Sequence, residues 1–315
     1  MSITEFGKLF DFFENNGGKN SFETHEYYMM SECTSFKLGG PARIAVFPLS
    51  ISAFKILVAF LSSTNISFKV IGNGTNIVAS DSGYDGVLII TKKMCEFFAD
   101  GETIYAGCGT GLSRIANIAA ELSLSGMENL FGIPATVGGA VFMNAGAHGS
   151  QISDVLTSAE CYDIENDVFV TLNNKQMNFE YRHSICKEKN LVVISATFSL
   201  ARGNGEEIKR RMKDVLAKRK ASQPLELPNA GSIFKRPENN FAGKLIEDAG
   251  LKGRRVGDAE VSVKHAGFIV NKGQATSADI CNLINVIKAE GLPGKYAPKT
   301  AGEILQKAIS RMADD

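Results

Sequence analysis

Two polar residues have sequence neighbours that suit the binding of an anionic substrate and the transfer of a proton. Arg182 follows Tyr181 in a predicted loop, and an arginine beside an aromatic ring can clamp a carboxylate through two parallel N–H bonds. Ser232 directly follows Gly231, which leaves its hydroxyl sterically open, as a proton donor or nucleophile requires. The alternatives are a solvated surface arginine and a serine that caps a helix or turn. Local sequence leaves both interpretations open.

Hydrolase and metal chemistry find little support in the chain. No G-x-S-x-G elbow surrounds Ser232. The six cysteines are scattered, none forms a C-x-x-C pair and none clusters with histidine, so we expect no metal site. His183 could act as an acid or base, although an isolated histidine is more often structural or solvated.

Two short glycine loops could accept a phosphate group. The loop Gly72-Asn73-Gly74-Thr75-Asn76 follows a predicted strand, and consecutive backbone N–H groups in such a loop can surround a phosphate oxygen. Residues 107–111 precede a predicted helix, whose dipole favours an anion at its N-terminus. The 72–76 loop is neither a Walker loop nor a Rossmann fingerprint. Each could also be a plain turn.

Residues 132–149 are half glycine and alanine within an otherwise ordinary apolar chain. Missing side-chain bulk lets the backbone approach something closely. That partner could be a flat, phosphate-bearing cofactor or another piece of the chain.

Composition places the chain among globular proteins with ordinary cores. Its 315 residues are 44% hydrophobic and 22% charged, with a net charge of zero. We therefore expect no nucleic acid and no membrane as a partner. No apolar run is long enough to span a membrane and no secretory signal is visible, so we expect a cytoplasmic protein with reduced thiols.

The elements that position these residues follow an α/β order first and an α+β order later. Helices are predicted over residues 1–16, 52–63, 112–122, 203–220, 241–249 and 277–290 from apolar spacing and end signals. Strands are predicted over 42–48, 68–71, 86–90, 103–106, 159–163, 168–171, 191–199 and 265–270. The charged helix 203–220 is a plausible entry to a second domain.

Together these segments resemble the UDP-N-acetylenolpyruvoylglucosamine reductase family, in its shorter subclass without an extra tyrosine-bearing loop. The matching pieces occur in the family's order and cover about residues 34–270. They are 34–42 (TSFKLGGPA), the 72–76 loop, the 132–149 run, Tyr181-Arg182, 229–237, 241–247 (FAGKLIE) and 264–268 (KHAGF).

The resemblance implies an α+β protein with two domains. Residues 1–202 would form an FAD-binding domain of the vanillyl-alcohol-oxidase (PCMH) type, and residues 203–315 a substrate-binding domain whose tail returns to the active site. NADPH would reduce noncovalent FAD, which would then reduce an enolpyruvyl UDP-sugar to UDP-N-acetylmuramate for peptidoglycan synthesis. Such an enzyme serves cell wall biogenesis, cell shape and cell division, and we expect a monomer. The alternatives are another FAD-dependent oxidoreductase of this fold and a non-catalytic flavin- or nucleotide-sugar-binding protein.

The same resemblance assigns roles to the catalytic residues. Arg182 would stabilise the charge that develops on the substrate carboxylate, and Ser232 would donate a proton. Glu303 matches a glutamate near the family's C-terminus, although Pro298 and Thr300 depart from its pattern and an exposed helix glutamate is the alternative.

The resemblance also implies binding residues. The expected substrate contacts are Tyr181, Arg219 and Lys235. The expected FAD contacts are Gly72, Asn73, Gly74, Thr75, Asn76, Gly132, Thr136, Gly138, Gly139 and Asn144, and a bulky replacement of Gly138 should cost FAD binding before it costs the fold.

Overall fold

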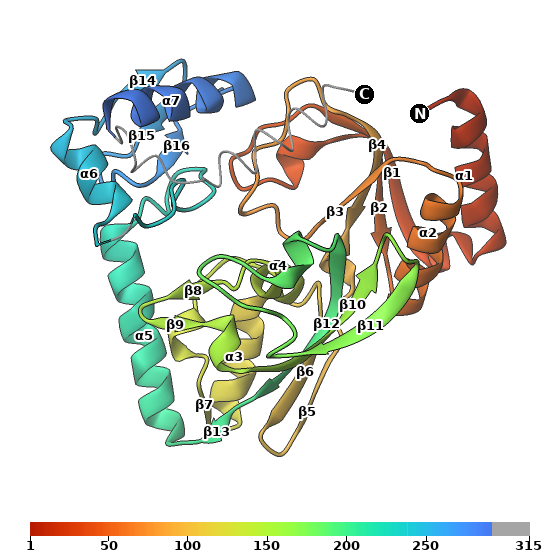
Figure 1. The fold of residues 1–315 in the computed structure, drawn as a ribbon, viewed down its shortest axis with the longest axis horizontal. Coiled ribbons are helices and arrows are strands. Elements are labelled where there is room, and N and C mark those ends of the chain that lie inside the picture. The colour runs from red at the N-terminus through yellow and green to blue at the C-terminus, as the bar shows by residue number, and fades with distance from the viewer. Residues whose placement is uncertain (238, 292–315) are drawn as a thin grey trace. The chain divides into compact units, whose positions relative to one another are not determined.

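The chain forms seven α-helices and sixteen strands among the residues that the computed structural model describes, 1–237 and 239–291 (Figure 1). The helices are α1 (Ile3–Asn15), α2 (Ile51–Ser63), α3 (Leu112–Glu121), α4 (Val137–Phe142), α5 (Gly205–Ser222), α6 (Ala242–Asp248) and α7 (Ser277–Glu290). None of these described helices is long and apolar enough to cross a membrane.

Sequence signals set the helix ends. Ser2 and Glu5 form a capping box at α1, and Thr276 and Asp279 form another at α7. After α1 the chain turns at Gly17, whose φ of 96° suits glycine. These ends agree with the predicted helices.

Antiparallel strands dominate the sheets. A five-stranded sheet has the order β11-β10-β12-β6-β5, with every neighbouring pair antiparallel. A four-stranded sheet has the order β1-β2-β4-β3, in which β3 and β4 are parallel. A three-stranded sheet, β14-β15-β16, lies later in the chain. The bounds are β1 (Phe22–Met29), β2 (Pro41–Pro48), β3 (Phe68–Ile71), β4 (Tyr84–Ile90), β5 (Phe97–Asp100), β6 (Thr103–Gly107), β7 (Leu124–Ser125), β8 (Gly146–Ala147), β9 (Ser150–Gln151), β10 (Leu156–Asp163), β11 (Val168–Asn173), β12 (Leu191–Ser199), β13 (Ala201–Arg202), β14 (Arg255–Val256), β15 (Ala259–Val261) and β16 (Ile269–Asn271).

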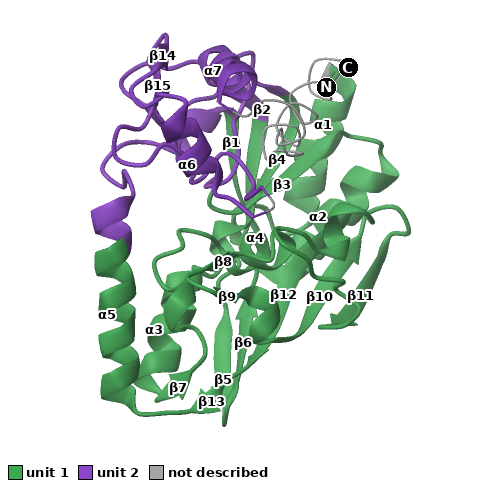
Figure 2. Ribbon diagram, turned by 60° about the vertical axis from the view of Figure 1, so that its left-hand side comes forward, with its two compact units in different colours: residues 1–26, 44–73, 85–218 green, residues 27–43, 74–84, 219–315 purple. Residues whose placement is uncertain are grey.

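The chain divides into two compact units, coloured in Figure 2. Unit 1 comprises residues 1–26, 44–73 and 85–218, and unit 2 comprises residues 27–43, 74–84 and 219–315. This division by packing places two segments of the N-terminal half in unit 2. The predicted FAD-binding domain, residues 1–202, and the predicted substrate-binding domain, residues 203–315, remain predictions.

Each unit has its own hydrophobic core. One core of unit 1 joins α1 and α2 to the four-stranded sheet through residues such as Phe13, Leu57 and Val87. The core of unit 2 includes Phe36 and Val78, both from the N-terminal half of the sequence, packed with residues of α6 and α7. A second core of unit 1 buries Val137, Ala140 and Val141 of α4 and so excludes water from the buried face of that helix.

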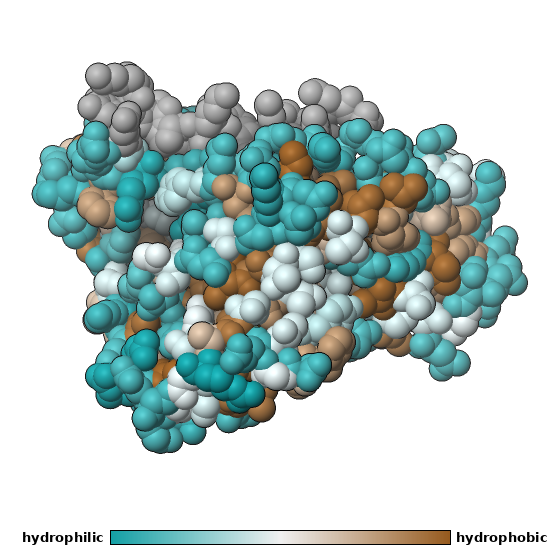
Figure 3. Space-filling model, turned by 60° about the horizontal axis from the view of Figure 1, so that its bottom comes forward, coloured by the Kyte–Doolittle hydropathy of each residue, from teal (hydrophilic) through white to brown (hydrophobic). Residues whose placement is uncertain are grey.

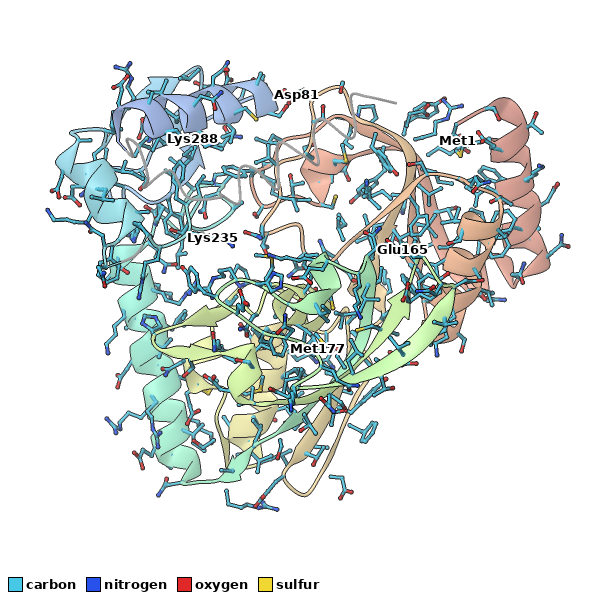
Figure 4. The ribbon with its side chains drawn as sticks, in the orientation of Figure 1. Met1, Asp81, Glu165, Met177, Lys235 and Lys288 are labelled. Atoms are coloured by element: carbon cyan, nitrogen blue, oxygen red, sulfur yellow. The ribbon has the colours of Figure 1, made fainter. Side chains whose placement is uncertain are left out.

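A carboxylate fixes the 74–84 segment to α7 within unit 2. Asp81, labelled in Figure 4, accepts hydrogen bonds from the Ser277 backbone N–H at 2.8 Å and from the Ser277 hydroxyl at 2.7 Å. An anion at this position also complements the positive end of the helix dipole. The segment that carries Gly74, Thr75 and Asn76 is therefore anchored to the C-terminal part of the chain.

Some large apolar side chains remain at the surface. On the face drawn in Figure 3, hydrophobic residues in brown reach the surface between hydrophilic residues in teal. Phe98 is 60% exposed on the edge strand β5, where its ring stacks on Tyr105. Exposed single apolar residues are common on globular proteins.

One predicted strand is partly wrong. Residues 265–268 form a turn, closed by the Phe268 N–H donating to the His265 carbonyl at 3.0 Å, and strand β16 begins only at Ile269. The predicted elements did not include the short helix α4 or the strands β1, β5, β7, β8, β9, β13, β14 and β15. The remaining predicted elements are confirmed with shifts of a few residues at their ends.

Candidate active site

Arg182 occupies the tip of a tight turn in unit 1. The Glu180 N–H donates to the His183 carbonyl, and the His183 N–H donates to the Glu180 carbonyl, both at 3.2 Å. Arg182 itself has a φ of 58°, in the left-handed region that favours glycine or asparagine. Holding an arginine there costs about 1 kcal/mol. Such strain persists where surrounding contacts impose it, and it is concentrated at functional sites.

Backbone carbonyl groups orient the Arg182 guanidinium. Its two terminal nitrogens donate to the Asn144 carbonyl at 3.2 Å and to the Gly146 carbonyl at 2.5 Å. The guanidinium carbon lies 4.9 Å from the centre of the Tyr181 ring. The two bonds to these neutral carbonyls fix the plane of the guanidinium. Lys187 holds the turn from the other side by donating to the Arg182 carbonyl at 2.6 Å.

The glycine-rich run folds into helix α4 and the hairpin of β8 and β9. Thr136 caps α4 by accepting the Gly139 N–H at 3.4 Å. Gly138 is buried against Cys108, whose Cβ would lie 2.7 Å from a Cβ built on Gly138. Gly139 is exposed, and a Cβ there would meet only the Thr136 hydroxyl oxygen, at 3.6 Å. Close approach to another piece of chain thus explains Gly138, whereas Gly139 offers bare backbone to a ligand.

Thr136 and Gly132 also serve the fold of unit 1. A Cβ on Gly72 would lie 2.2 Å from the Thr136 hydroxyl oxygen, so only glycine fits at position 72. Gly132 has a φ of 82°, and its N–H donates to the Ser113 hydroxyl at 3.1 Å. These contacts shape the predicted cofactor segment from within the protein.

The glycine loop 72–76 contains the point where the chain passes from unit 1 to unit 2. On the unit 1 side, the Asn73 amide donates to the Pro134 carbonyl at 3.0 Å. On the unit 2 side, Gly74 has a φ of 62°, and a Cβ there would lie 2.1 Å from the Cys33 carbonyl oxygen. Thr75 is half-buried and Asn76 is exposed. The loop is tightly held at its glycines and open at Asn76.

Ser232 in unit 2 is exposed and weakly held. Within the described part of the chain, its hydroxyl donates one hydrogen bond, to the Gly267 carbonyl at 3.5 Å, the long limit for such a bond. The backbone beside it is better fixed, because the Ile233 N–H donates to the same carbonyl at 2.9 Å. Ser232 therefore has a fixed position and a hydroxyl that can turn toward a ligand.

A histidine that received no role from the sequence lies beside Ser232. A Cβ on Gly267 would lie 3.0 Å from both the Ser232 hydroxyl oxygen and the His265 ring. His265 Nδ1 accepts the Gly267 N–H at 3.1 Å, which assigns the proton of the neutral ring to Nε2. Burial lowers the pKa of His265, so the ring is neutral at neutral pH. The segment 264–268, noted only as a family match, was the available signal.

Arg219 is a buried cation. Arg219 is only 8% exposed, and its Nε has no hydrogen-bond partner among the described residues. Burial lowers the pKa of the Arg219 guanidinium. A buried charge is costly unless it is paired, so this position favours a bound anion. Tyr181 is 47% exposed and Lys235, labelled in Figure 4, is half-buried.

Two further predictions concern Glu303 and metal binding. Glu303, and with it the alternative of an exposed helix glutamate, lies outside the described residues. Among the described residues no group of three or more histidine, cysteine, aspartate or glutamate side chains could hold a metal ion.

Comparisons with known proteins match both parts of the chain. A model of an FAD-binding domain matches residues 42–173, and a model of the UDP-N-acetylenolpyruvoylglucosamine reductase C-terminal domain matches residues 223–290. The UDP-N-acetylenolpyruvoylglucosamine reductase of Clostridium novyi is 47% identical over 260 residues, which cover 82% of this chain and 84% of the relative. That of Caldanaerobacter subterraneus is 47% identical over 259 residues, covering 82% and 85%. The crystal structure of UDP-N-acetylenolpyruvylglucosamine reductase (MurB) from Thermus caldophilus has a TM-score of 0.75 at 34% identity, covering 85% of this chain and 95% of that one.

The fold and these matches define an FAD-dependent oxidoreductase with a FAD-binding domain ahead of a distinct C-terminal domain. The chain belongs to the UDP-N-acetylenolpyruvoylglucosamine reductase family. The predicted α+β fold class, enzyme class and FAD cofactor are confirmed.

Proposed function

We propose that this protein reduces the enolpyruvyl ether of UDP-N-acetylglucosamine with NADPH, giving UDP-N-acetylmuramate for peptidoglycan synthesis. Family membership supports the reaction, and the Arg182 turn is the observation that carries it to this chain. A hydride adds to the methylene carbon of the enolpyruvyl group and a proton adds to the neighbouring carbon, so the double bond becomes single. FAD, when bound, supplies that hydride after receiving it from NADPH.

Arg182 is proposed to stabilise the charge that grows on the substrate carboxylate. Hydride addition to an enol ether conjugated to a carboxylate pushes negative charge toward that carboxylate. A cation already fixed by two carbonyl bonds need not reorganise as the charge develops. The neighbouring Tyr181 ring would contact the same substrate.

Ser232 is proposed to donate the proton. Its single long bond at 3.5 Å leaves the hydroxyl free to turn toward the reacting carbon. A serine is a weak acid, so transfer becomes favourable only as the carbanion develops. Glu303 is proposed as the third catalytic residue, on its match to a glutamate near the family's C-terminus.

Arg219 and Lys235 are proposed to hold anionic groups of the substrate. Arg219 is buried, and its Nε has no acceptor in the ranges 1–237 and 239–291; a phosphate oxygen would supply both an acceptor and a negative charge there. Lys235 is half-buried, as a cation at the edge of a binding site would be.

FAD is proposed to contact the loop 72–76, Gly132, and the 136–139 segment. The exposed Gly139, where no side chain intervenes, fits a close approach by a flat or phosphate-bearing group. The Asn144 side chain, also predicted to contact FAD, is bonded within the protein and receives a different role below.

The structure sharpens the expected effect of the glycine substitutions. Gly138→Val should disturb the packing on Cys108 first, contrary to the expectation that it costs FAD binding before the fold. Gly139→Ala is the better test, because an added methyl group in a close contact costs about 1–3 kcal/mol. We expect FAD binding to weaken about tenfold or more, measured by flavin fluorescence titration, with little change in the unfolding temperature of the apoprotein. Unchanged FAD affinity in Gly139→Ala would remove Gly139 from the proposed contacts.

We also propose a monomeric cytoplasmic enzyme. All six cysteines are free thiols, as in proteins of reducing compartments. Sedimentation of the purified protein at several concentrations would test the monomer.

The function is tested by NADPH consumption with and without the enolpyruvyl UDP-sugar. The proposal expects substrate-dependent consumption and formation of UDP-N-acetylmuramate by purified, yellow protein. Flavin that is bleached by another reductant but leaves the enolpyruvyl sugar unreduced would favour a different oxidoreductase. Tight sugar-nucleotide binding without turnover would favour a non-catalytic binding protein.

A further inference from the structure

We infer that Asn144 is a positioning residue, which holds the Arg182 guanidinium in place by joining the 180–183 turn to the β8–β9 hairpin. The inference rests on the proposed role of Arg182. It assigns Asn144 to the substrate step of the reaction, in place of the FAD contact expected from the sequence.

The side chain of Asn144 is committed to bonds inside unit 1. The residue is fully buried, and its amide nitrogen donates to the Glu180 carbonyl at 3.0 Å and to the Gln151 side-chain oxygen at 3.3 Å. Its side-chain oxygen accepts the Ser153 N–H at 3.0 Å. An amide has two N–H donors, and both are used. No donor remains for a ligand.

One donor reaches the backbone of the turn that carries Arg182, and the other reaches a side chain of the β8–β9 hairpin. Glu180 begins the turn that carries Arg182. Gln151 pairs with Gly146 across the β8–β9 hairpin, and the Gly146 carbonyl is one of the two acceptors of the guanidinium. One amide therefore fixes both the turn and the strand against which the guanidinium lies.

The backbone of Asn144 supplies the second acceptor. Its own carbonyl accepts from Arg182 at 3.2 Å. Asn144 has a φ of 42°, a left-handed conformation that asparagine and glycine tolerate better than other residues. The residue type thus meets two demands together: a left-handed backbone and an amide with two donors.

The test compares Asn144→Gly with Asn174→Ala. Glycine keeps the left-handed backbone of position 144 and removes only the amide. Asn174 is a matched control, because its amide nitrogen also donates two hydrogen bonds within unit 1, to the Ser153 and Leu156 carbonyls at 2.8 Å, and neither acceptor belongs to the 180–183 turn.

We expect Asn144→Gly to slow the reoxidation of reduced enzyme by the enolpyruvyl UDP-sugar about 100-fold, since small misplacements of a catalytic group have effects of this size. Reduction by NADPH should stay within about twofold. Hydrogen exchange of the Glu180 and His183 amides should accelerate in Asn144→Gly and remain unchanged in Asn174→Ala, whatever the activity.

Two results separate the inference from the proposed function. If Arg182→Lys slows reoxidation and Asn144→Gly behaves like Asn174→Ala in both rate and exchange, the positioning role is wrong. If Arg182→Lys itself leaves reoxidation unchanged, the proposed role of Arg182 is wrong. Slower FAD reduction with normal reoxidation in Asn144→Gly would return Asn144 to the flavin and overturn the inference.

Discussion

The turn at Arg182 and the segment at Ser232 differ in how firmly they hold the proposed catalytic group. The Arg182 guanidinium is bound by two carbonyls, its backbone is in a strained left-handed conformation, and Lys187 holds its carbonyl. Ser232 is exposed, and the bond that its hydroxyl makes to the described residues, to the Gly267 carbonyl, is at the long limit of 3.5 Å. Rigid support is concentrated on the cation.

The difference fits the roles proposed for the two groups. A cation that stabilises developing charge works best when it is already oriented, because reorientation during the reaction would cost free energy. A proton donor must instead release its proton, and strong bonds to the protein would hold the hydroxyl in the wrong direction. Preorganisation of Arg182 and freedom of the Ser232 hydroxyl are therefore complementary.

The largest expected effect comes from Ser232→Ala. Removing a positioned general acid lowers turnover about 100- to 10,000-fold. The wild-type and Ala proteins should share one unfolding temperature, because the lost bond is at best weak. Steady-state NADPH oxidation measures the effect. Turnover within a few-fold of wild type would show that the proton comes from elsewhere.

A smaller effect is expected from Arg182→Lys. Lysine retains the charge and the strained backbone position, but it lacks the planar fork that fits two carbonyls and a carboxylate together. We expect a loss of about 100-fold or somewhat more in kcat, as for removal of one transition-state donor. A change confined to KM would mean that Arg182 only binds substrate and does not favour the transition state.

The smallest effect is expected from Gly267→Ala. The added Cβ would lie 3.0 Å from the Ser232 hydroxyl oxygen and from the His265 ring, so one of them must move slightly. Because the hydroxyl is loosely held, we expect only a several-fold loss of turnover, on the scale of about 1 kcal/mol of crowding. A loss as large as that of Ser232→Ala would show that the Ser232 region is as rigid as the Arg182 turn.

Much of the fold could be predicted because its signals are local. Apolar spacing and capping residues located α7, and a β-rich run located β12. The strand predicted over 265–270 was partly wrong, because the apolar run 268–270 directly follows a turn stabilised by the bond from the Gly267 N–H to His265 Nδ1. Strand β1 went unrecognised because most of its residues are polar or only partly buried.

The site could be predicted only in part because its support is long-range. Family motifs pointed to Arg182 and Ser232, but the bond from Asn144 to Glu180 joins residues 36 positions apart. From the sequence, an asparagine beside a glycine-rich run looks the same whether its amide faces a cofactor or the protein. Likewise, Gly138 and Gly139 are identical in type, and only packing on Cys108 separates their roles.

The two half-reactions, measured separately by anaerobic rapid mixing, test the central claim most directly. Arg182 and Ser232 are proposed to act on the enolpyruvyl sugar, so reduction of the enzyme by NADPH should be near normal in Arg182→Lys and Ser232→Ala. Reoxidation by the enolpyruvyl UDP-sugar should be slow in both. Equal slowing of both half-reactions in either variant would contradict the account.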